Sequence, residues 1–469
     1  MEHWLVQQVH RSPNAIAVET DEQKLTFQQL FEMAKRYGSG LITLNQTRIG
    51  LLVDNSIEAL GLIHGAWLYN IEIALINNRL TDNEIMKQMQ SINVNTIVTT
   101  ENYYARVQET ELSEQLRCLT GSDILSDVVQ HPLPKFQETT IASIMFTSGT
   151  TGPQKAVPQT FTNHRASAEG CFTHLGFDTN TRWLTVLPIY HISGLSIVLR
   201  SVRYGFTLYL MDKFDEQRIL DAVVFKGITH MSLVPLTLKR LMRAGLTEPY
   251  QLEKILLGGA KLERDFVEQA LAYKLPIYNS FGMTETCSQF LTASPEMLAK
   301  NPETVGLTGS QNQLKIMSPN DEGHGELYVR GDNVMNGYLY PEGLTHTYDV
   351  EGFFKTGDIA SVDANGFVMI HDRRKDLIIS GGENIYPNEI ERVAKLHVDV
   401  DDAMCVGVKD DEWGQRPVLY LVAHKEIPNM ASFLAQYLAK YKLPKTIQYV
   451  QSLPYTSTGK LKRQLLNGE

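Results

Sequence analysis

The sequence contains few cysteines and no spacing of cysteine and histidine that suits a metal ion. Its four cysteines, Cys118, Cys171, Cys287 and Cys405, are scattered and include no CxxC pair. A disulfide framework or a structural zinc site is therefore not expected, and a reducing compartment, the cytoplasm, is favoured. The first residues also lack the basic and apolar segments of a secretory signal peptide.

An excess of positive charge and a long apolar run are missing as well. Acidic residues outnumber basic residues 53 to 43, giving a formal net charge of -10, which argues against a nucleic-acid partner. The most apolar stretch, residues 183–202, is interrupted by His191, Ser193, Ser196 and Arg200 and does not resemble a membrane span. The expected partners are small-molecule substrates, and association into homo-oligomers is left open.

Strand-like and helix-like segments alternate over most of the chain. Short apolar runs typical of buried strands occur at residues 49–53, 96–99, 184–187, 207–211, 255–257 and 277–278. Amphipathic helical patterns lie between them, for example at residues 83–91 and 266–273. This alternation predicts an α/β fold with parallel sheets that helices cover on both faces.

The pattern changes in the last third of the chain, which at 469 residues is too long for a single hydrophobic core. Shorter alternating runs predict a small β-rich subdomain at about residues 306–371. The charge run at residues 372–376 is typical of either a solvated turn or a linker. We therefore predict an N-terminal domain at 1–371, a hinge at 372–375 and a small α+β C-terminal domain at 376–469, with a helix at 431–440.

The strongest local signal is the loop TSGTTGPQK at residues 147–155, directly after an apolar run. Free backbone N–H groups, hydroxyls and a lysine suit a polyphosphate. The loop is no Walker A motif, because its glycines stand three residues apart and Ala156 follows the lysine where Ser or Thr is required. A polar surface turn is the alternative. The candidate nucleotide ligands here are Thr147, Ser148, Gly149, Thr150, Thr151, Gly152 and Lys155.

Five motifs in a fixed order make the chain resemble the adenylate-forming superfamily, which includes acyl-CoA synthetases, peptide-synthetase adenylation domains and beetle luciferases. The loop is the first, and FGMTE at 281–285, TGD at 356–358, RRKD at 373–376 and TGK at 458–460 follow it. The resemblance covers essentially the whole chain. It implies an acid–thiol ligase that uses ATP, coenzyme A and Mg²⁺ and passes through an acyl-adenylate.

The resemblance assigns roles to residues that would otherwise be interpreted as exposed charges. Glu285 is expected to hold Mg²⁺, a hard cation that prefers oxygen ligands, and Asp358 and Arg373 are expected to bind the ribose. Lys460 would offset charge that grows on the acyl carboxylate and the α-phosphate. The remaining ATP-binding residues are Asn279, Ser280, Phe281 and Thr284, and the catalytic set adds Lys155 and His191.

The resemblance also implies that the C-terminal domain rotates between the two half-reactions. Lys375 is the expected pivot, and Ser380, Gly381 and Gly382 would face the thiol arm of coenzyme A. Three positions depart from the common pattern, since Ala156 and Asp372 stand where glycine is usual and Phe281 stands where tyrosine is usual. None of these changes removes a charged or nucleotide-contacting side chain.

Three segments resemble the branch of the superfamily that joins o-succinylbenzoate to coenzyme A in menaquinone biosynthesis. They are PIYHISGLS at 188–196, GMTETCSQ at 282–289 and SGGENIYP at 380–387. The predicted acyl-substrate residues are His191, Ser193, Ser196, Gly258, Gly259, Ala260, Gly282, Ser288 and Gln289. Polar groups suit a second carboxylate, because burying them against an alkyl chain costs about 1–3 kcal/mol for each hydrogen bond left unmade.

Several alternatives stay open. The hydroxyls of the predicted acyl wall could satisfy backbone groups, and His191 could be a core residue. The enzyme could be a CoA ligase for another aromatic or fatty acid, or a peptide-synthetase adenylation domain, although no carrier-domain sequence follows residue 469. A catalytically silent adenylate-binding regulator is a further alternative, against which Lys460 and Glu285 argue.

Overall fold

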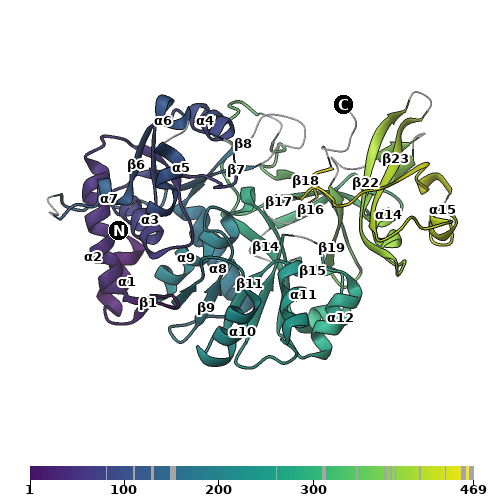
Figure 1. Cartoon of the computed structure of the whole chain (residues 1–469), viewed down its shortest axis with the longest axis horizontal. Helices are drawn as coiled ribbons and strands as arrows, with labels where there is room; N and C mark the ends of the chain where they lie inside the picture. The colour runs from purple at the N-terminus through teal and green to yellow at the C-terminus, as the bar shows by residue number, and fades with distance from the viewer. Residues whose placement is uncertain are drawn as a thin grey trace. The chain divides into compact units, whose positions relative to one another are not determined.

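The computed structural model describes most of the chain and divides it into two compact units. The described residues are 1–80, 82–108, 111–127, 131–147, 155–259, 261–308, 313–344, 347–373, 378–380, 383–385, 387–410, 413–438, 440–455 and 461–463. The first unit contains residues 1–312 and 330–348, and the second contains residues 313–329 and 349–469 (Figure 1). The domain limits proposed above at residues 371 and 375 remain predictions.

An eight-stranded sheet forms one half of the first unit within the described residues, in the order β14-β13-β12-β11-β9-β10-β1-β2. Its central strands are parallel, and β2 and β14 add antiparallel edges. The bounds are β1 Ile16–Glu19, β2 Lys24–Thr26, β9 Arg182–Thr185, β10 Thr207–Leu210, β11 His230–Leu233, β12 Lys254–Leu257, β13 Ile277–Met283 and β14 Ser288–Ala293.

A six-stranded sheet forms the other half, in the order β6-β5-β3-β4-β7-β8. Only its last pair, β7 with β8, is antiparallel among the described strands. The bounds are β3 Arg48–Leu52, β4 Glu72–Leu75, β5 Thr96–Thr99, β6 Arg117–Thr120, β7 Ile141–Thr147 and β8 Lys155–Thr160. Strand β5 is buried along its whole length, as expected for a parallel strand covered on both faces.

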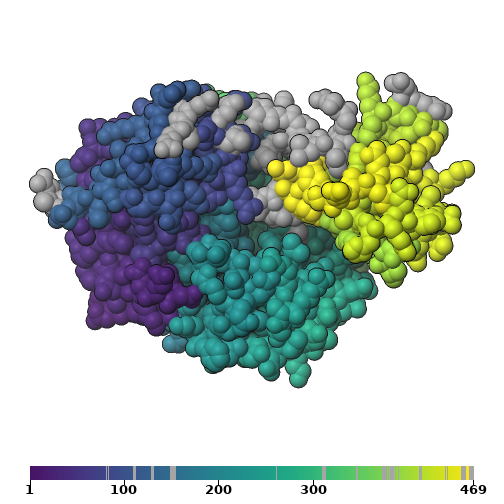
Figure 2. All heavy atoms as spheres, viewed as in Figure 1, coloured from purple at the N-terminus to yellow at the C-terminus, as the bar shows by residue number. Residues whose placement is uncertain are grey.

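Helices cover both sheets, as the alternation in the sequence predicts. Leu184 and Tyr209 pack with α10, α11 and α12 on one face of the larger sheet, and the surface of this part of the chain is teal in the space-filling view (Figure 2). Trp183 and Leu208 pack on the opposite face with α1, α2, α3, α8 and α9. A further cluster of the first unit joins α4 to the smaller sheet.

The helices of the first unit begin and end close to the predicted patterns, with α4 and α12 at the two expected positions. The bounds are α1 Trp4–Arg11, α2 Phe27–Ile42, α3 Ile57–Leu68, α4 Asp82–Ser91, η1 Glu101–Tyr103, α5 Tyr104–Gln108, α6 Glu111–Gln115, α7 Gly121–Ile124, α8 Phe161–Leu175, α9 Ile192–Tyr204, α10 Glu216–Phe225, α11 Pro235–Ala244, α12 Arg264–Ala272, η2 Thr284–Thr286 and α13 Pro295–Lys300, with the short strand β15 at Thr304–Leu307. The predicted α/β class is confirmed. None of the described helices is long and apolar enough to cross a membrane.

The second unit contains two sheets, and the described strand pairs in them are antiparallel except for β23 with β24, which is parallel. Strands β16 to β19 lie in the order β19-β18-β17-β16, and β20 to β24 form a second sheet. A separate core of buried Ile390, Leu419 and Leu434 packs α14 and α15 on the second sheet. The bounds are β16 Gln313–Met317, β17 Gly325–Arg330, β18 Phe354–Val362, β19 Phe367–Arg373, β20 Ile378–Ser380, β21 Glu383–Ile385, α14 Pro387–Ala394, β22 Val400–Asp410, β23 Gly414–Ala423, α15 Met430–Leu434, η3 Lys440–Lys442 and β24 Thr446–Tyr449.

Candidate functional site

The FGMTE motif lies at the turn between β13 and β14, where the strand leaves the carboxyl edge of the larger sheet. A Cβ atom on Gly282 would stand 2.0 Å from the carbonyl oxygen of Ser288, so this close hairpin requires glycine. Cys287 and Ser288 have φ values of 53° and 91°, a backbone region that costs energy for residues other than glycine. The turn directs Glu285 inward, and its side chain is nearly buried.

Glu285 is held by the segment that follows β17. The Tyr338 hydroxyl donates to Glu285 Oε1 at 2.8 Å, and the Met335 N–H donates to the Glu285 carbonyl oxygen at 2.9 Å. Lys155 Nζ lies 4.6 Å from the centroid of the Tyr338 ring. Two predicted residues therefore contact the same tyrosine, Glu285 at its hydroxyl and Lys155 at its ring.

The two ends of the glycine-rich loop also meet. Thr147 ends β7, Lys155 begins β8, and the two residues are cross-strand partners. The Gln159 amide on β8 donates to the Thr284 carbonyl oxygen at 2.7 Å and its oxygen accepts from Ser143 Oγ at 2.7 Å. The antiparallel pair β7–β8 thus supports both the phosphate-loop lysine and the turn that carries Glu285.

A buried histidine completes this network. His164 Nε2 lies 3.0 Å from Ser143 Oγ, and its Nδ1 lies 3.2 Å from Cys287 Sγ. Burial, assisted by the nearby Arg200 charge, lowers the pKa of His164 to about 3. The histidine is therefore neutral near pH 7 and accepts or donates hydrogen bonds without adding charge to the site.

The predicted acyl wall begins at the loop before α9. The Asn55 amide donates to the carbonyl oxygens of Leu187 and Met211, each at 3.1 Å, and accepts from Ile189 N at 3.0 Å. His191 is the N-cap residue of α9, and its ring lies 4.7 Å from that of Tyr190. One amide therefore fixes the loop that presents His191.

Two segments of the wall, α9 and β14, are brought together. Ser196 Oγ lies 3.5 Å from Ser288 Oγ, and the Gln289 side chain is nearly buried beside them. Ser193 is exposed, and Ser196 Oγ also approaches the Ser193 carbonyl oxygen at 3.4 Å. The predicted grouping of Ser196, Ser288 and Gln289 has a geometric basis.

Arg200, a charged residue within the most apolar stretch of the sequence, lies behind this wall. It is 1% exposed, and its Nη2 donates to Gln289 Oε1 at 3.0 Å and to Ser167 Oγ at 3.4 Å. No carboxylate pairs with it among the described residues. Burying a cation without a counterion is costly, so a charge inside an apolar run was the signal that could have identified it.

The residues predicted around the adenine and the flat part of the acyl pocket are mostly engaged with backbone. Ser280 Oγ donates to the Leu257 carbonyl oxygen at 2.8 Å, and Asn279 Nδ2 donates to that of Thr304 at 2.8 Å. A Cβ atom on Gly258 would stand 2.9 Å from Ser280 Oγ, and Gly259 follows it. These two polar side chains donate to backbone carbonyls, and their assignment to ATP binding stays a prediction.

The second unit contains three predicted residues that the structure describes. Asp358 is nearly buried, and its backbone N–H donates to Thr356 Oγ1 at 3.0 Å. Asp358 and Arg373 are cross-strand partners on β18 and β19, and Ser380 ends β20. The remaining predicted residues, Ser148, Gly149, Thr150, Thr151, Gly152, Ala260, Lys375, Gly381, Gly382 and Lys460, lie outside the described residues.

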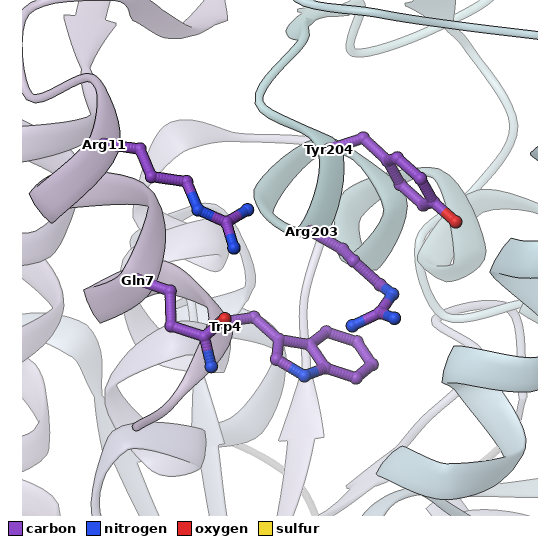
Figure 3. A pocket seen from close by; sticks show the side chains of 5 residues that line it. All are labelled: Trp4, Gln7, Arg11, Arg203 and Tyr204. Atoms are coloured by element: carbon purple, nitrogen blue, oxygen red, sulfur yellow. The ribbon is translucent and has the colours of Figure 1, made fainter. Parts of the chain in front are cut away.

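A hollow of about 210 Å³ lies elsewhere, at the end of α9 away from the wall (Figure 3). It is lined by Trp4, Gln7, Arg11, Arg203 and Tyr204. Arg203 already pairs with Glu169 at 2.7 Å and stacks over Trp4 at 5.2 Å. The hollow contains no predicted site residue.

The residues present suit a magnesium ion that arrives with a nucleotide. The described residues contain no group of three or more histidine, cysteine, aspartate or glutamate side chains able to hold a metal. Mg²⁺ is commonly bound by one or two carboxylates together with substrate phosphates. Glu285 near Lys155 fits that arrangement.

Comparison with known proteins agrees with this geometry. The family model described as AMP-binding enzyme matches residues 5–339, and the AMP-binding enzyme C-terminal domain matches residues 389–460. A 2-succinylbenzoate–CoA ligase of Staphylococcus epidermidis ATCC 12228 is 54% identical over 100% of this chain and 98% of that protein. A 2-succinylbenzoate–CoA ligase of Staphylococcus aureus RF122 is 52% identical over 99% of this chain and 99% of that protein.

Solved structures show the same similarity. The o-succinylbenzoate CoA synthetase of Bacillus subtilis, in complex with its acyl-adenylate intermediate, is 32% identical with a TM-score of 0.93, covering 100% of this chain and 98% of that one. The same enzyme in complex with ATP and magnesium ion gives an identity of 32% and a TM-score of 0.93, covering 100% of both chains.

Proposed function

The chain belongs to the family of AMP-binding enzymes, and we propose that within this family it is the ATP-dependent o-succinylbenzoate–CoA ligase of menaquinone biosynthesis. It is an acid–thiol ligase that uses ATP, coenzyme A and Mg²⁺. Similarity to ligases of that name over the full chain supports the assignment. We place the reaction in the cytoplasm, where these three compounds are available.

The chemistry divides one difficult substitution into two easier ones. An oxygen of the reacting carboxylate attacks the α-phosphorus of ATP, and pyrophosphate leaves. The sulfur of coenzyme A then attacks the acyl carbon, its proton is lost, and AMP leaves. AMP is a far better leaving group than the oxide of a free carboxylate, which is the reason for the first step.

The first unit would supply the groups for phosphate binding. Mg²⁺, when bound, shields the phosphate charge and polarises the bond to pyrophosphate, and Glu285 would hold it there. Lys155 would contact the phosphates from the end of β8. We further propose that Asp358 and Arg373 bind the ribose and that Lys460 enters for adenylation.

Buried Arg200 is the observation that carries the substrate assignment. o-Succinylbenzoate has two carboxylates, and one of them does not react. A guanidinium with no carboxylate partner among the described residues, hydrogen-bonded to Gln289 and one turn from Ser196, is suited to that second anion. A fatty acid offers no such group and would leave the arginine buried against hydrocarbon.

We also propose that the C-terminal domain, residues 376–469, rotates about Lys375 within a hinge at 372–375. The connectivity of the second unit supports this position. Its two sheets are joined by one chain connection, between the end of β19 at Arg373 and the start of β20 at Ile378. A single connection permits rotation by changes in a few backbone dihedrals.

A panel of acids tests the assignment. AMP release with o-succinylbenzoate should exceed release with benzoate and with octanoate at equal concentration by more than tenfold, since lost hydrogen bonds to a charged group cost about 1.5–3 kcal/mol. Arg200→Met should raise the KM for o-succinylbenzoate by about ten- to a hundredfold for the same reason. The KM values for benzoate and octanoate, which have no second carboxylate, should not rise.

The substitution separates binding from folding. Methionine resembles arginine in length, and an apolar replacement of a buried charge is often neutral or stabilising, so the thermal midpoint should hold. Arg240→Met removes an arginine that pairs with Glu216 on the surface and should leave the acid preference intact. Comparable turnover of octanoate by the unmodified enzyme would overturn the substrate assignment.

A further inference from the structure

Residues 331–340, which we name the bridging segment, connect the turn that carries Glu285 to strand β8. At one end, Asn333 Nδ2 donates to the Thr286 carbonyl oxygen at 3.0 Å, and Met335 N–H donates to that of Glu285 at 2.9 Å. At the other end, the backbone of residues 339–340 pairs with Ala156 through bonds of 2.9 and 2.8 Å. The segment is therefore fixed to η2 and to β8 independently.

Tyr338 lies between these two attachments, and its hydroxyl and its ring make different contacts. Its hydroxyl donates to Glu285 Oε1 at 2.8 Å, and no other side chain within the described part of the chain hydrogen-bonds this carboxylate. Its ring faces Lys155, with Nζ 4.6 Å from the ring centroid. A neutral donor and an aromatic face thus hold a carboxylate and an ammonium at the same time.

The arrangement keeps the two charges apart. If Lys155 paired directly with Glu285, each would neutralise the other, and the carboxylate would lose attraction for a divalent cation. Among the described residues Lys155 forms no ion pair, and each of the two groups contacts Tyr338 instead. A phenol hydroxyl fixes one carboxylate oxygen without cancelling its charge, and the ring attracts the ammonium without cancelling its charge either.

We propose that Tyr338 is a positioning residue for adenylation, one that fixes Glu285 for Mg²⁺ and Lys155 for the phosphates in a single geometry. The proposal rests on the proposed function, because it assumes that this site binds Mg²⁺ and ATP. Groups held in place before the reaction need no reorganisation as charge develops. Tyr338 itself touches neither the acid nor the reacting phosphorus.

Two substitutions separate the two contacts. Tyr338→Phe removes the hydroxyl and keeps the ring, so the Mg²⁺ concentration that half-saturates ATP binding should rise about ten- to a hundredfold, the usual effect of losing a hydrogen bond to a metal ligand. Tyr338→Leu removes the ring too and should additionally weaken ATP binding at saturating Mg²⁺. Calorimetric titration of ATP at a series of Mg²⁺ concentrations measures both effects.

Tyr348→Phe is the matched control. The Tyr348 hydroxyl donates to the Met335 carbonyl oxygen of the same segment, whereas the Glu285 carboxylate acts on it through its charge. Burial, together with that charge, raises the pKa of Tyr348 to about 12. This variant should bind ATP with the original Mg²⁺ dependence. If it shifts that dependence as much as Tyr338→Phe does, the effect is a general loosening of the segment and the proposal is overturned.

A second readout follows the two half-reactions. In Tyr338→Phe, formation of acyl-AMP should slow at limiting Mg²⁺, the KM for the acid should not change, and thioester formation from preformed acyl-AMP should proceed at the original rate. Equal slowing of both half-reactions would contradict the proposal. ATP titration requires no acid, so a wrong substrate assignment would leave the test of Tyr338 intact.

Discussion

Glu285 and Arg200 are both buried charges near the predicted site, and the sequence motifs assigned a role only to Glu285. Glu285 belongs to a contiguous motif, so five neighbouring letters identify it. Arg200 is a single residue on a helix, and its surroundings come from Ser167 on α8 and Gln289 on β14. Contacts of this kind join segments that are distant in sequence, and no local pattern encodes them.

The polar residues predicted around the nucleotide divide in the same way. The sequence correctly placed Thr147 and Lys155 at the two ends of one loop, because a strand precedes it. It could not show that Ser280 and Asn279 donate to backbone carbonyls, since those acceptors belong to neighbouring strands. Their assignment to ATP binding remains a prediction.

Lys460 provides the sharpest prediction for a single residue, although it lies outside the described residues. Lys460→Ala should slow adenylation by at least about a hundredfold, as expected when a group that stabilises transition-state charge is removed. Transfer from preformed acyl-AMP to coenzyme A should continue. Rapid-quench measurement of each half-reaction checks this, with Lys462→Ala, two residues away, as the control. Equal loss in both steps would refute the role.

Among the secondary-structure elements, α9 depends most on a contact that its own sequence does not reveal. Its first turn lies against the loop that Asn55 fixes, and Gly194 is buried there. A Cβ atom at this position would stand 2.3 Å from the Pro188 carbonyl oxygen and 2.7 Å from that of Leu187. Both are backbone atoms, which cannot move aside as a flexible side chain can.

Gly194→Ala should therefore destabilise the protein by about 1–3 kcal/mol, the usual cost of overpacking, and should raise the KM for the acid by moving α9. Gly170→Ala is the matched control, because Gly170 lies inside α8 with nothing within 4 Å of an added Cβ. Alanine there should stabilise the helix by about 0.5–1 kcal/mol. Denaturant unfolding of both variants measures the difference. A stable, fully active Gly194→Ala would show that the loop is free to move.

The element α15 and the hairpin after β13 both differ from what the local sequence pattern predicts. The predicted helix at residues 431–440 begins as α15 but ends at Leu434, after which the chain continues in tight turns. Met430, Leu434 and Leu438 are nonetheless all buried. The hairpin after β13 was not predictable, because its positive φ angles fall on Cys287 and Ser288, where glycine would be expected.

At the scale of the whole molecule, buried histidines give the fold a dependence on pH. His3, His64 and His164 are buried, and burial lowers the pKa of each to about 3. In the unfolded chain these residues titrate near pH 6.5. Protons therefore bind the unfolded state more readily, and the stability that is present above this pH is lost as the pH falls below it.

As the pH falls from about 7.5 to 5.5, each of these three histidines should lower the free energy of unfolding by about 1.4 kcal/mol, or by about 4 kcal/mol together. Free energies of unfolding in urea across this range measure the loss. His64→Gln should reduce the slope by about one quarter, whatever it does to stability at pH 7.5, because buried His230, whose pKa is lowered to about 4, contributes as well. A flat profile in the unmodified protein would contradict the burial of these rings.

The α/β class and the change to β-rich structure near the last third were predictable, since both depend on periodicity that extends over many residues. The division into units was not predictable in the same way, because the chain leaves the first unit at residue 313, returns at 330 and leaves again at 349. Local composition does not indicate where the chain returns to a unit that it has already left.

This path has a consequence for gene recombination. Because the chain crosses between the units at residues 312–313, 329–330 and 348–349, a single crossover cannot exchange one unit for that of a relative. A junction placed after residue 349 would combine new β18 and β19 with the old β16 and β17, so the strands of one sheet would come from two parents. The connection between β19 and β20 avoids this problem, and a single junction there would exchange the last sheet and its helices as a complete module.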